Sequence, residues 1–257
     1  ASNKKGGYDL TYDIIPPSVS GVTSTTSEGN FVATNTIDIK VTFTEDITVT
    51  GTPTLTLETG ASDQAVDYTS GSTSDDLIFR YTVATGHLNA DLDYLSTTAL
   101  ALNGGTMTDA AGNPATLTLP TPGASGSLSD DQTYNVDAIA PTVTSVNCTA
   151  SNATHGLTGA NVTDCANGSY NENDVLSISV VFDEAVNVAS ANPQLTLAMD
   201  GANETVNYNS GTGSTTLVFP FTIDDNDNTS DLDYAATSSL GLNSATIFDP
   251  LLVPNEW

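Results

Sequence analysis

Basic side chains are nearly missing from this 257-residue chain. Only Lys4, Lys5, Lys40 and Arg80 oppose 31 aspartates and glutamates, which gives a net charge of −27. Proteins bind nucleic acid mainly through cations that displace phosphate counterions. The charge therefore argues against nucleic acid and anionic membrane surfaces as partners, and it favours solubility and the recruitment of divalent cations.

Long apolar runs are missing too. None approaches the roughly 20 residues that span a bilayer, so we expect no direct membrane insertion. The chain begins at Ala1 without an apolar segment, as the mature form of a processed protein would. Two cysteines do not make a disulfide scaffold. Lys, Glu and Arg are scarce while Thr, Ser, Gly, Asn and Asp abound, which favours strands and turns over helices.

The chain contains an internal sequence repeat of two copies. The motif Asp-Leu-Asp-Tyr stands at 91–94 and returns 140 residues later at 231–234. The same offset carries Tyr68 onto Tyr208 and Pro53 onto Pro193. Internal repetition at this length predicts two domains, residues 16–138 and 139–257, preceded by an N-terminal extension of residues 1–15.

Apolar residues alternate with polar ones through both repeats. The clearest predicted strand has Ile37, Ile39, Val41 and Phe43 on one face, and Leu176 to Phe182 repeat it. Gly, Ser and Asp clusters separate such runs, as turns do. Seven or so short strands per repeat, among them 116–119 and a closing strand at Gln132–Val136, predict an all-β fold of two tandem β-sandwiches.

The two repeats differ at their ends. The second repeat has a longer loop at 147–170, and its correspondence with the first ends at Asp249, so it has no counterpart of the closing strand. The extension, by contrast, carries a strand pattern that belongs to neither repeat. Its apolar positions are Tyr8, Leu10, Tyr12 and Ile14.

The surplus strand matches the missing one, because Tyr12 aligns with Tyr134 and Ile14 with Val136. An unfilled sandwich exposes unpaired edge groups, which promote association. We therefore predict donor-strand complementation, in which Tyr8–Ile15 inserts into the second repeat of the next copy and buries those four apolar side chains. Such a head-to-tail contact propagates as a filament.

Several motifs together resemble the immunoglobulin-like tandem repeats of bacterial cell-surface proteins and adhesins. They are Ala-Pro-Thr-Val at 140–143, Phe-x-Glu at 43–45 and 182–184, Pro-Thr-Leu-Thr-Leu at 53–57, Asp-Leu-Asp-Tyr, and Asp-Ala-Ala-Gly-Asn at 109–113. The resemblance covers nearly the whole chain from Pro16 to Asp249. It implies two immunoglobulin-like sandwiches in an extracellular stalk or fibre, often stiffened by calcium, although fold alone does not fix function.

Calcium is the cofactor that the acidic loops favour, because it takes six to eight oxygen ligands from flexible segments. An acidic loop that binds nothing tightly is the alternative. The densest cluster comprises Asp224, Asp225, Asp227, Asp231 and Asp233. The resemblance to calcium-bound repeats implies a second site at the joint between the repeats, with Asp137 and either Glu45 or Glu184.

The loop that occurs only in the second repeat contains both cysteines. Cys148 and Cys165 are separated by 16 residues, and we expect a disulfide because the composition suits an extracellular protein. A reduced pair would fit a cytosolic protein instead. The second repeat also contains six Asn-x-Ser/Thr sequons, where glycans could attach: Asn147, Asn152, Asn161, Asn167, Asn203 and Asn228.

Signals for catalysis are weak. His87 and His155 stand in loop-like contexts without a pattern that pairs either with a nucleophile, and no Gly-x-Ser-x-Gly motif occurs. The acidic pairs of the Asp-Leu-Asp-Tyr motifs could imitate glycosidase carboxylates. Turn residues or calcium ligands explain them better, so we expect no enzyme.

We therefore expect a structural subunit of an extracellular, cell-surface filament whose partners are copies of itself. One alternative is a pair of stalk repeats from a large calcium-dependent adhesin, which would contact surface glycans or host cells. Another is a carbohydrate-binding module, for which exposed aromatic platforms are expected. Trp257 is the only tryptophan, and the tyrosines fall mostly on predicted buried faces.

Overall fold

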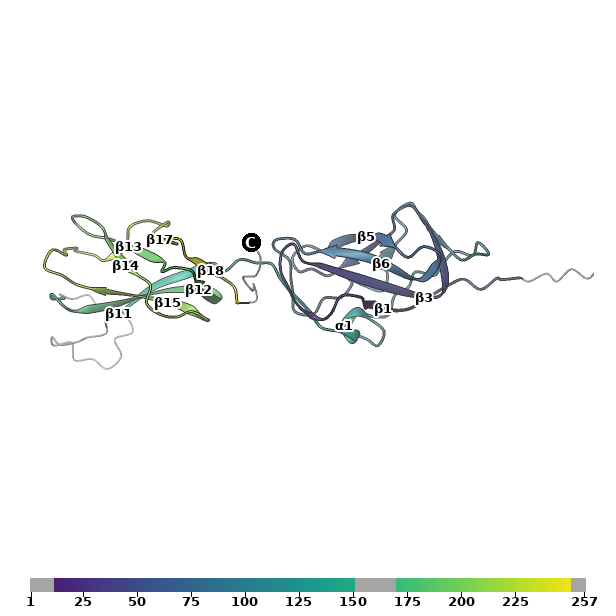
Figure 1. Cartoon of the computed structure of the whole chain (residues 1–257), viewed down its shortest axis with the longest axis horizontal. Coiled ribbons are helices and arrows are strands. Elements are labelled where there is room, and N and C mark those ends of the chain that lie inside the picture. The colour runs from purple at the N-terminus through teal and green to yellow at the C-terminus, as the bar shows by residue number, and fades with distance from the viewer. Residues whose placement is uncertain (1–11, 151–169, 251–257) are drawn as a thin grey trace, which may run out of the picture. The chain divides into compact units, whose positions relative to one another are not determined.

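The computed structural model describes residues 12–150 and 170–250. The chain divides into two compact units, unit 1 (Ala1–Ile139) and unit 2 (Ala140–Trp257). The regular elements of each unit are almost all strands, which form curled and mostly antiparallel sheets (Figure 1), so the all-β prediction is confirmed. No helix in the described ranges is long and apolar enough to cross a membrane.

Unit 1 contains a single helical turn among short strands and one long strand, β3. Its elements are β1 (Val19–Ser24), β2 (Gly29–Phe31), β3 (Thr36–Thr50), β4 (Thr54–Leu57), β5 (Gln64–Ser70), β6 (Ser74–Thr82), β7 (Leu88–Asn89), β8 (Leu100–Ala101), β9 (Thr106–Thr108), α1 (Leu128–Asp131) and β10 (Tyr134–Asp137).

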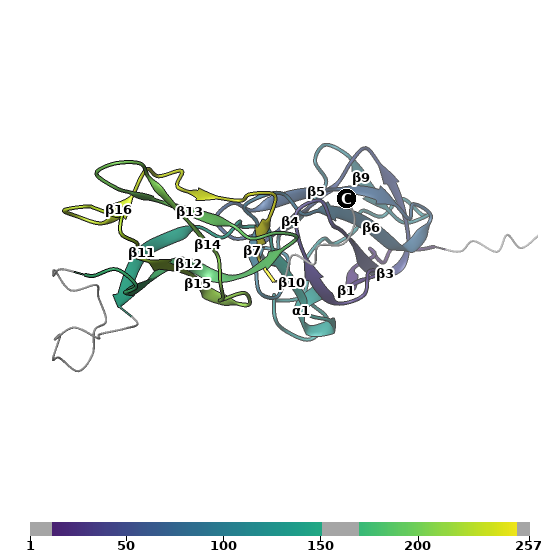
Figure 2. The same ribbon diagram turned by 60° about the vertical axis from the view of Figure 1, so that its left-hand side comes forward.

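Two sheets enclose the core of unit 1. The larger has the order β1-β3-β6-β5-β4-β8, with β9 paired to the end of β3. The smaller has the order β2-β10-β7, in which β10 runs parallel to β2 and antiparallel to β7 (Figure 2). The predicted alternation along β3 is confirmed, since Ile37, Ile39, Val41 and Phe43 are all buried.

Unit 2 repeats most of this plan. Its strands are β11 (Val143–Ala150), β12 (Val175–Ala189), β13 (Gln194–Ala198), β14 (Glu204–Asn207), β15 (Ser214–Thr222), β16 (Asp233–Tyr234), β17 (Leu240–Gly241) and β18 (Thr246–Phe248). One sheet has the order β11-β12-β15 with β18 on β12, and the other has β14-β13-β16 with β17 on β13. Within residues 140–150 and 170–250, nothing corresponds to the sheet β2-β10-β7.

Three predicted elements differ in the structure. Thr116 forms only an isolated bridge, with Ser18, so the expected strand at 116–119 is wrong. The closing strand begins at Tyr134 rather than Gln132, because α1 precedes it and the Gln132 N–H donates to the Leu128 carbonyl at 3.3 Å. Residues 12–15, the described end of the predicted leading strand, belong to no strand, since no neighbouring strand in the described chain pairs with them.

Candidate functional site: an open edge of unit 2

Strand β10 fills the middle of the small sheet in unit 1. Its inward side chains, Tyr134 and Val136, are fully buried. The Leu92 N–H donates to the Tyr134 carbonyl at 2.9 Å, and the Ala138 N–H donates to the His87 carbonyl at 2.8 Å. The strand therefore closes unit 1 by burying apolar surface and by pairing backbone groups that would otherwise be exposed.

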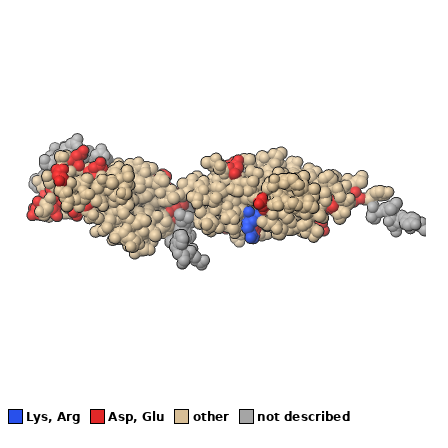
Figure 3. Space-filling model, turned by 90° about the horizontal axis from the view of Figure 1, so that it is seen from above, with Lys and Arg blue, Asp and Glu red and all other residues tan. Residues whose placement is uncertain are grey.

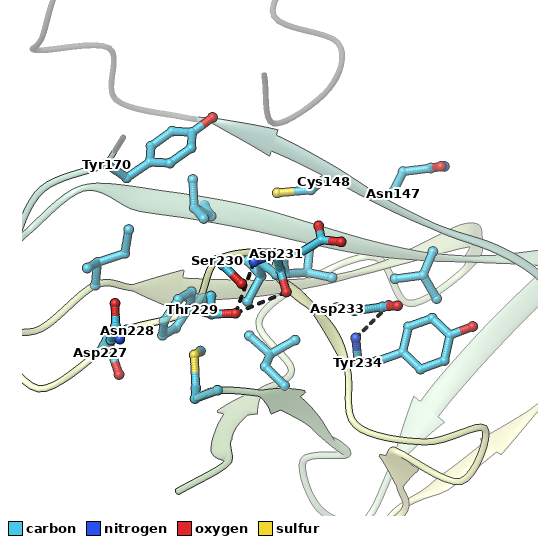
Figure 4. A pocket seen from close by; sticks show the side chains of 18 residues that line it. Asn147, Cys148, Tyr170, Asp227, Asn228, Thr229, Ser230, Asp231, Asp233 and Tyr234 are labelled. Carbon is cyan, nitrogen blue, oxygen red and sulfur yellow. Dashed lines mark hydrogen bonds between the residues drawn. The ribbon is translucent and has the colours of Figure 1, made fainter. Parts of the chain in front are cut away.

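Unit 2 has a cavity of about 690 Å³ beside residues 231–234, the counterpart of the motif at 91–94. Apolar side chains from β11, β12, β13 and β15 line one part of it, and the acidic segment 227–234 lines another (Figure 4). The lining residues are Val146, Asn147, Cys148, Tyr170, Leu176, Ile178, Leu197, Met199, Phe221, Ile223, Asp227, Asn228, Thr229, Ser230, Asp231, Leu232, Asp233 and Tyr234. We call this cavity the unit 2 groove.

Strand registers show that segment 231–234, which lines the unit 2 groove, corresponds to segment 91–94, which lies beside β10 in unit 1. Leu57 bridges to Tyr94 in unit 1, and Leu197 pairs with Tyr234 in unit 2. The aspartate before each tyrosine makes the same local hydrogen bond: Asp93 and Asp233 each accept the N–H of the following tyrosine. The groove therefore lies beside the counterpart of the segment that contacts β10 in unit 1.

The acidic residues beside β10 are satisfied in unit 1. Burial raises the pKa of Asp91, whereas a hydrogen bond from the Tyr134 backbone lowers it, and the net pKa is raised. Asp93 is buried, and its Oδ2 accepts hydrogen bonds from Ser129 Oγ at 2.7 Å and Gly123 N–H at 3.0 Å. Segment 123–134 thus supplies partners for both carboxylates.

Their counterparts in unit 2, Asp231 and Asp233, are exposed on the rim of the groove. Within the described part of unit 2, Asp233 accepts a hydrogen bond from the Tyr234 N–H at 2.7 Å. Acidic side chains also gather at one end of unit 2 (Figure 3). The groove therefore combines an apolar floor with a negatively charged rim.

The cations of the described chain lie in unit 1 and are paired (Figure 3). Lys40 Nζ lies 3.2 Å from Asp76 Oδ2, and Arg80 forms two bonds of 2.6 and 2.7 Å with the Asp38 carboxylate. The hydrogen bond from Arg80 lowers the pKa of Asp38. The other two cations, Lys4 and Lys5, lie in the N-terminal extension outside the described residues.

The predicted subunit-interface residues are exposed where they are described. Tyr12 is 84% and Ile14 80% exposed, and Ile15 is exposed as well. Tyr8 and Leu10 lie outside the described residues. Tyr12, Ile14 and Ile15 together form an exposed apolar stretch, and contiguous exposed apolar surface marks interaction sites.

Three carboxylates in unit 1 lie close enough to share a cation. Asp13, Glu45 and Asp109 each bring one oxygen to within 4.8 Å of the others. Burial raises the pKa of Glu45, and the charges of Asp13 and Asp109 raise it further. Burial also acts to raise the pKa of Asp109, but hydrogen bonds from Asn113 and the adjoining backbone outweigh it and lower the pKa. Anionic oxygen donors of this kind fit calcium.

Of these three, sequence reasoning found only Glu45. The signal for Asp109 was present, because the repeat aligns it with Asp249 just as it aligns Glu45 with Glu184. Asp13 was missed because the extension was aligned as a strand and not as a linker. In the structure, Asp13 Oδ1 accepts the Ile15 N–H at 3.1 Å, which fixes a turn ahead of β1.

In the predicted calcium cluster at 224–233, Asp224, Asp225 and Asp227 accept hydrogen bonds from neighbouring residues of the same turn. Asp227 Oδ2 accepts the Asp224 N–H at 2.8 Å, and Asp224 Oδ1 accepts the Asn226 N–H at 2.8 Å. Asp225 accepts the side-chain amide of Asn226. Among described residues the cluster yields no group of three carboxylates as compact as that of unit 1. Calcium binding there stays a prediction.

Asp137 and Glu184, the two residues predicted for the joint, belong to β10 and β12 respectively. Asp137 ends β10, and its Oδ1 accepts the Ile139 N–H at 3.1 Å. Glu184 lies half-buried within β12, directly after Asp183. Asp183 accepts hydrogen bonds from the Thr142 hydroxyl and backbone, which lower its pKa. Their role in calcium binding is likewise still a prediction.

Cys148 lies on β11 and lines the groove beside Asn147 (Figure 4). Cys165 lies outside the described residues, so the disulfide between them stays a prediction. Of the sequon asparagines, Asn147, Asn203 and Asn228 are exposed and accessible to a glycan. Asn152, Asn161 and Asn167 lie outside the described residues.

Comparisons with known proteins leave the site to be interpreted from its own geometry: no protein-family model matches the sequence, and no curated protein matches it.

Proposed function

We propose that this chain is the structural subunit of an extracellular, cell-surface filament. Segment Tyr8–Ile15 of one molecule completes unit 2 of the next by donor-strand complementation. The observation that carries the proposal is the unit 2 groove, which is lined by the counterpart of the segment that contacts strand β10 in unit 1. Each unit is then an immunoglobulin-like sandwich, complete within the chain for unit 1 and completed by a neighbour for unit 2.

The properties of the extension support this occupant. Its apolar residues alternate with Asp9, Thr11 and Asp13, so that one face of the strand would enter the groove and the other face water. Burial of Tyr8, Leu10, Tyr12 and Ile14 would contribute about 6–12 kcal/mol before the cost of ordering the segment. Added edge hydrogen bonds supply further affinity, as in other strand-addition complexes.

Because donor and acceptor are different surfaces of the same chain, the contact does not close on itself. Each bound molecule offers a new groove and a new extension, so that assembly continues along one axis. The function is therefore mechanical rather than catalytic. Copies of the same chain are the principal partners, and surface glycans or cell surfaces would be contacted by the finished fibre.

Calcium forms part of the proposal as a stiffening ion. Asp13, Glu45 and Asp109 would supply carboxylate ligands at the N-terminal end of unit 1. The repeat pattern places Asp137, Glu184 and Asp249 at the matching sequence positions. A divalent cation bound by such carboxylates would offset their mutual repulsion. It would also hold Asp13, which precedes β1, against Glu45 and Asp109 of unit 1.

A truncation tests the proposal. Removal of residues 1–15 should abolish filaments and leave monomers with folded units, as judged by electron microscopy, sedimentation and circular dichroism. The control is the full chain with Leu10→Asp and Tyr12→Asp, which keeps the length and loses the apolar face. Truncated protein that still polymerised would contradict the proposal.

The alternative, a pair of stalk repeats from a longer adhesin, predicts a different result. In that case the following chain fills the groove, and the N-terminal segment belongs to the preceding repeat. The full chain and the truncated chain would then both remain monomeric at high concentration. Head-to-tail polymers of the full chain alone would rule this alternative out.

A further inference from the structure

The entry of the chain into unit 1 matches its entry into unit 2. Asp13 Oδ1 accepts the Ile15 N–H, and Asp137 Oδ1 accepts the Ile139 N–H, both at 3.1 Å. Six residues after each aspartate a valine opens the first strand: Val19 pairs with Phe43, and Val143 with Phe182. Both pairings then shift register at the same step. Asp13 is therefore the counterpart of Asp137, 124 residues apart.

This equivalence fixes the register in which an extension would follow the path of β10. Leu10 takes the place of Tyr134, and Tyr12 takes the place of Val136. Sequence similarity alone aligns Tyr12 with Tyr134, which is shifted by two residues. A shift of two keeps the same side chains facing inward, so burial patterns cannot separate the registers, whereas the turn geometry does.

Counted backwards at the same offset of 124 residues, Lys5 aligns with Ser129, which lies in α1 ahead of β10. In unit 1 the Ser129 hydroxyl donates to Asp93 Oδ2 at 2.7 Å. The counterpart of Asp93 on the rim of the groove is the exposed Asp233, with Asp231 close by in sequence. Lys5 would therefore lie near Asp233. The unit 1 counterpart of Asp233 is Asp93, which accepts a hydrogen bond from Ser129, the residue that aligns with Lys5.

We infer that Lys5 of the incoming extension pairs with Asp233 of the neighbouring molecule and thereby fixes the register of the donor strand. The inference rests on the proposed function and specifies its contact residues. Lys4 adds positive charge beside Asp231, while Gly6 and Gly7 let the chain bend where unit 1 has α1. In a chain of net charge −27, the extension carries two of the four cations, and the groove rim carries acids.

The pairing makes polymerisation depend on charge. Lys5→Gln should raise the critical concentration for filament formation about two- to fivefold, the range of a solvent-exposed ion pair. Lys5→Glu and Asp233→Lys should each weaken assembly more, and the double variant Lys5→Glu/Asp233→Lys should restore it. Lys40→Gln, which removes the partner of Asp76 in unit 1, is the matched control and should leave assembly unchanged. Wild-type assembly should weaken with added salt more than that of Lys5→Gln.

Cysteine pairs test the register itself. The chain carrying Lys5→Cys and Asp233→Cys should form intermolecular disulfides in filaments, mapped by mass spectrometry, whereas Gly7→Cys with Asp233→Cys should not. Cross-linking only through Gly7→Cys, or no rescue by the charge swap, would overturn the inference. If these variants have no effect while the truncation of residues 1–15 abolishes filaments, the donor strand stands and the lysine contact is wrong. If the truncation has no effect either, the proposed function is wrong as well.

Discussion

Tyr94 and Tyr234 hold the same position in the two units and differ sharply in exposure. Tyr94 is 1% exposed, and its hydroxyl donates to the Pro120 carbonyl at 2.7 Å, whereas Tyr234 is 39% exposed. The segment that covers Tyr94 comes from residues that follow β9 in unit 1, and the described part of unit 2 provides no such cover. The same Asp-Leu-Asp-Tyr motif is thus covered in unit 1 and partly exposed in unit 2.

The neighbouring leucines give a matched pair of mutations. Leu92 is fully buried, so Leu92→Ala should lower the free energy of unfolding of unit 1 by about 2–5 kcal/mol. Leu232 is only half-buried, so Leu232→Ala should cost unit 2 less than that in the monomer and should weaken filament assembly. Thermal unfolding of the two variants measures the difference. Equal costs in the monomer would mean that the groove is already filled.

A repeated glycine turn should be needed in both units. A Cβ on Gly71 would lie 2.0 Å from the Asp76 carbonyl oxygen, and one on Gly211 would lie 2.0 Å from the Thr216 carbonyl oxygen. Both glycines also have positive φ, 110° and 113°. Gly71→Ala and Gly211→Ala should each destabilise their own unit by more than about 1 kcal/mol. Gly86→Ala, where φ is positive but nothing lies within 4 Å, is the milder control.

Calcium should stabilise unit 1 in a pH-dependent way. Burial and the charges of Asp13 and Asp109 raise the pKa of Glu45, so folded protein holds this proton more tightly than unfolded protein. The contribution of Glu45 to stability is therefore highest below its unfolded pKa and falls as pH rises through the folded pKa. Calcium offsets this loss, and the rise in melting temperature with millimolar calcium should grow across the same window.

The variant Asp13→Asn should reduce the rise in melting temperature that calcium causes. Asp46→Asn, at an exposed residue next to Glu45, is the control and should leave that rise unchanged. Differential scanning calorimetry with calcium and with a chelator provides the measurement. An unchanged melting temperature at neutral pH would exclude a calcium role for these carboxylates.

Much of the fold was readable from the sequence because it depends on alternation and repetition. The period-two pattern predicted the first halves of β3 and β12, up to Phe43 and Phe182, since a one-residue slip would turn their apolar faces outward. The strand at 116–119 was predicted because Thr-Leu-Thr-Leu alternates, but alternation does not guarantee a pairing partner, and only Thr116 bridges to another segment. The helical turn α1 was not predicted, because four residues are too few to show a helical period.

The candidate site was predictable only where two copies could be compared. That residues 140–150 and 170–250 hold no counterpart of β10 was expected from the point where the repeat correspondence stops. The carboxylates of Asp13 and Asp109, by contrast, meet Glu45 only through the fold. They lie far apart in sequence, and Asp13 is brought in by a turn ahead of β1. Acidic density pointed instead to 224–233, where aspartates serve the turn itself.

The most direct test of the central claim uses a synthetic peptide of residues 1–17 and the truncated chain that lacks residues 1–15. The claim predicts a saturable rise in the melting temperature of unit 2 alone, equivalent to about 2.7 kcal/mol at one hundred times the dissociation constant. A peptide with Leu10→Asp and Tyr12→Asp should give no rise. No stabilisation by the native peptide, or equal stabilisation by both, would contradict the claim that the extension is the missing strand.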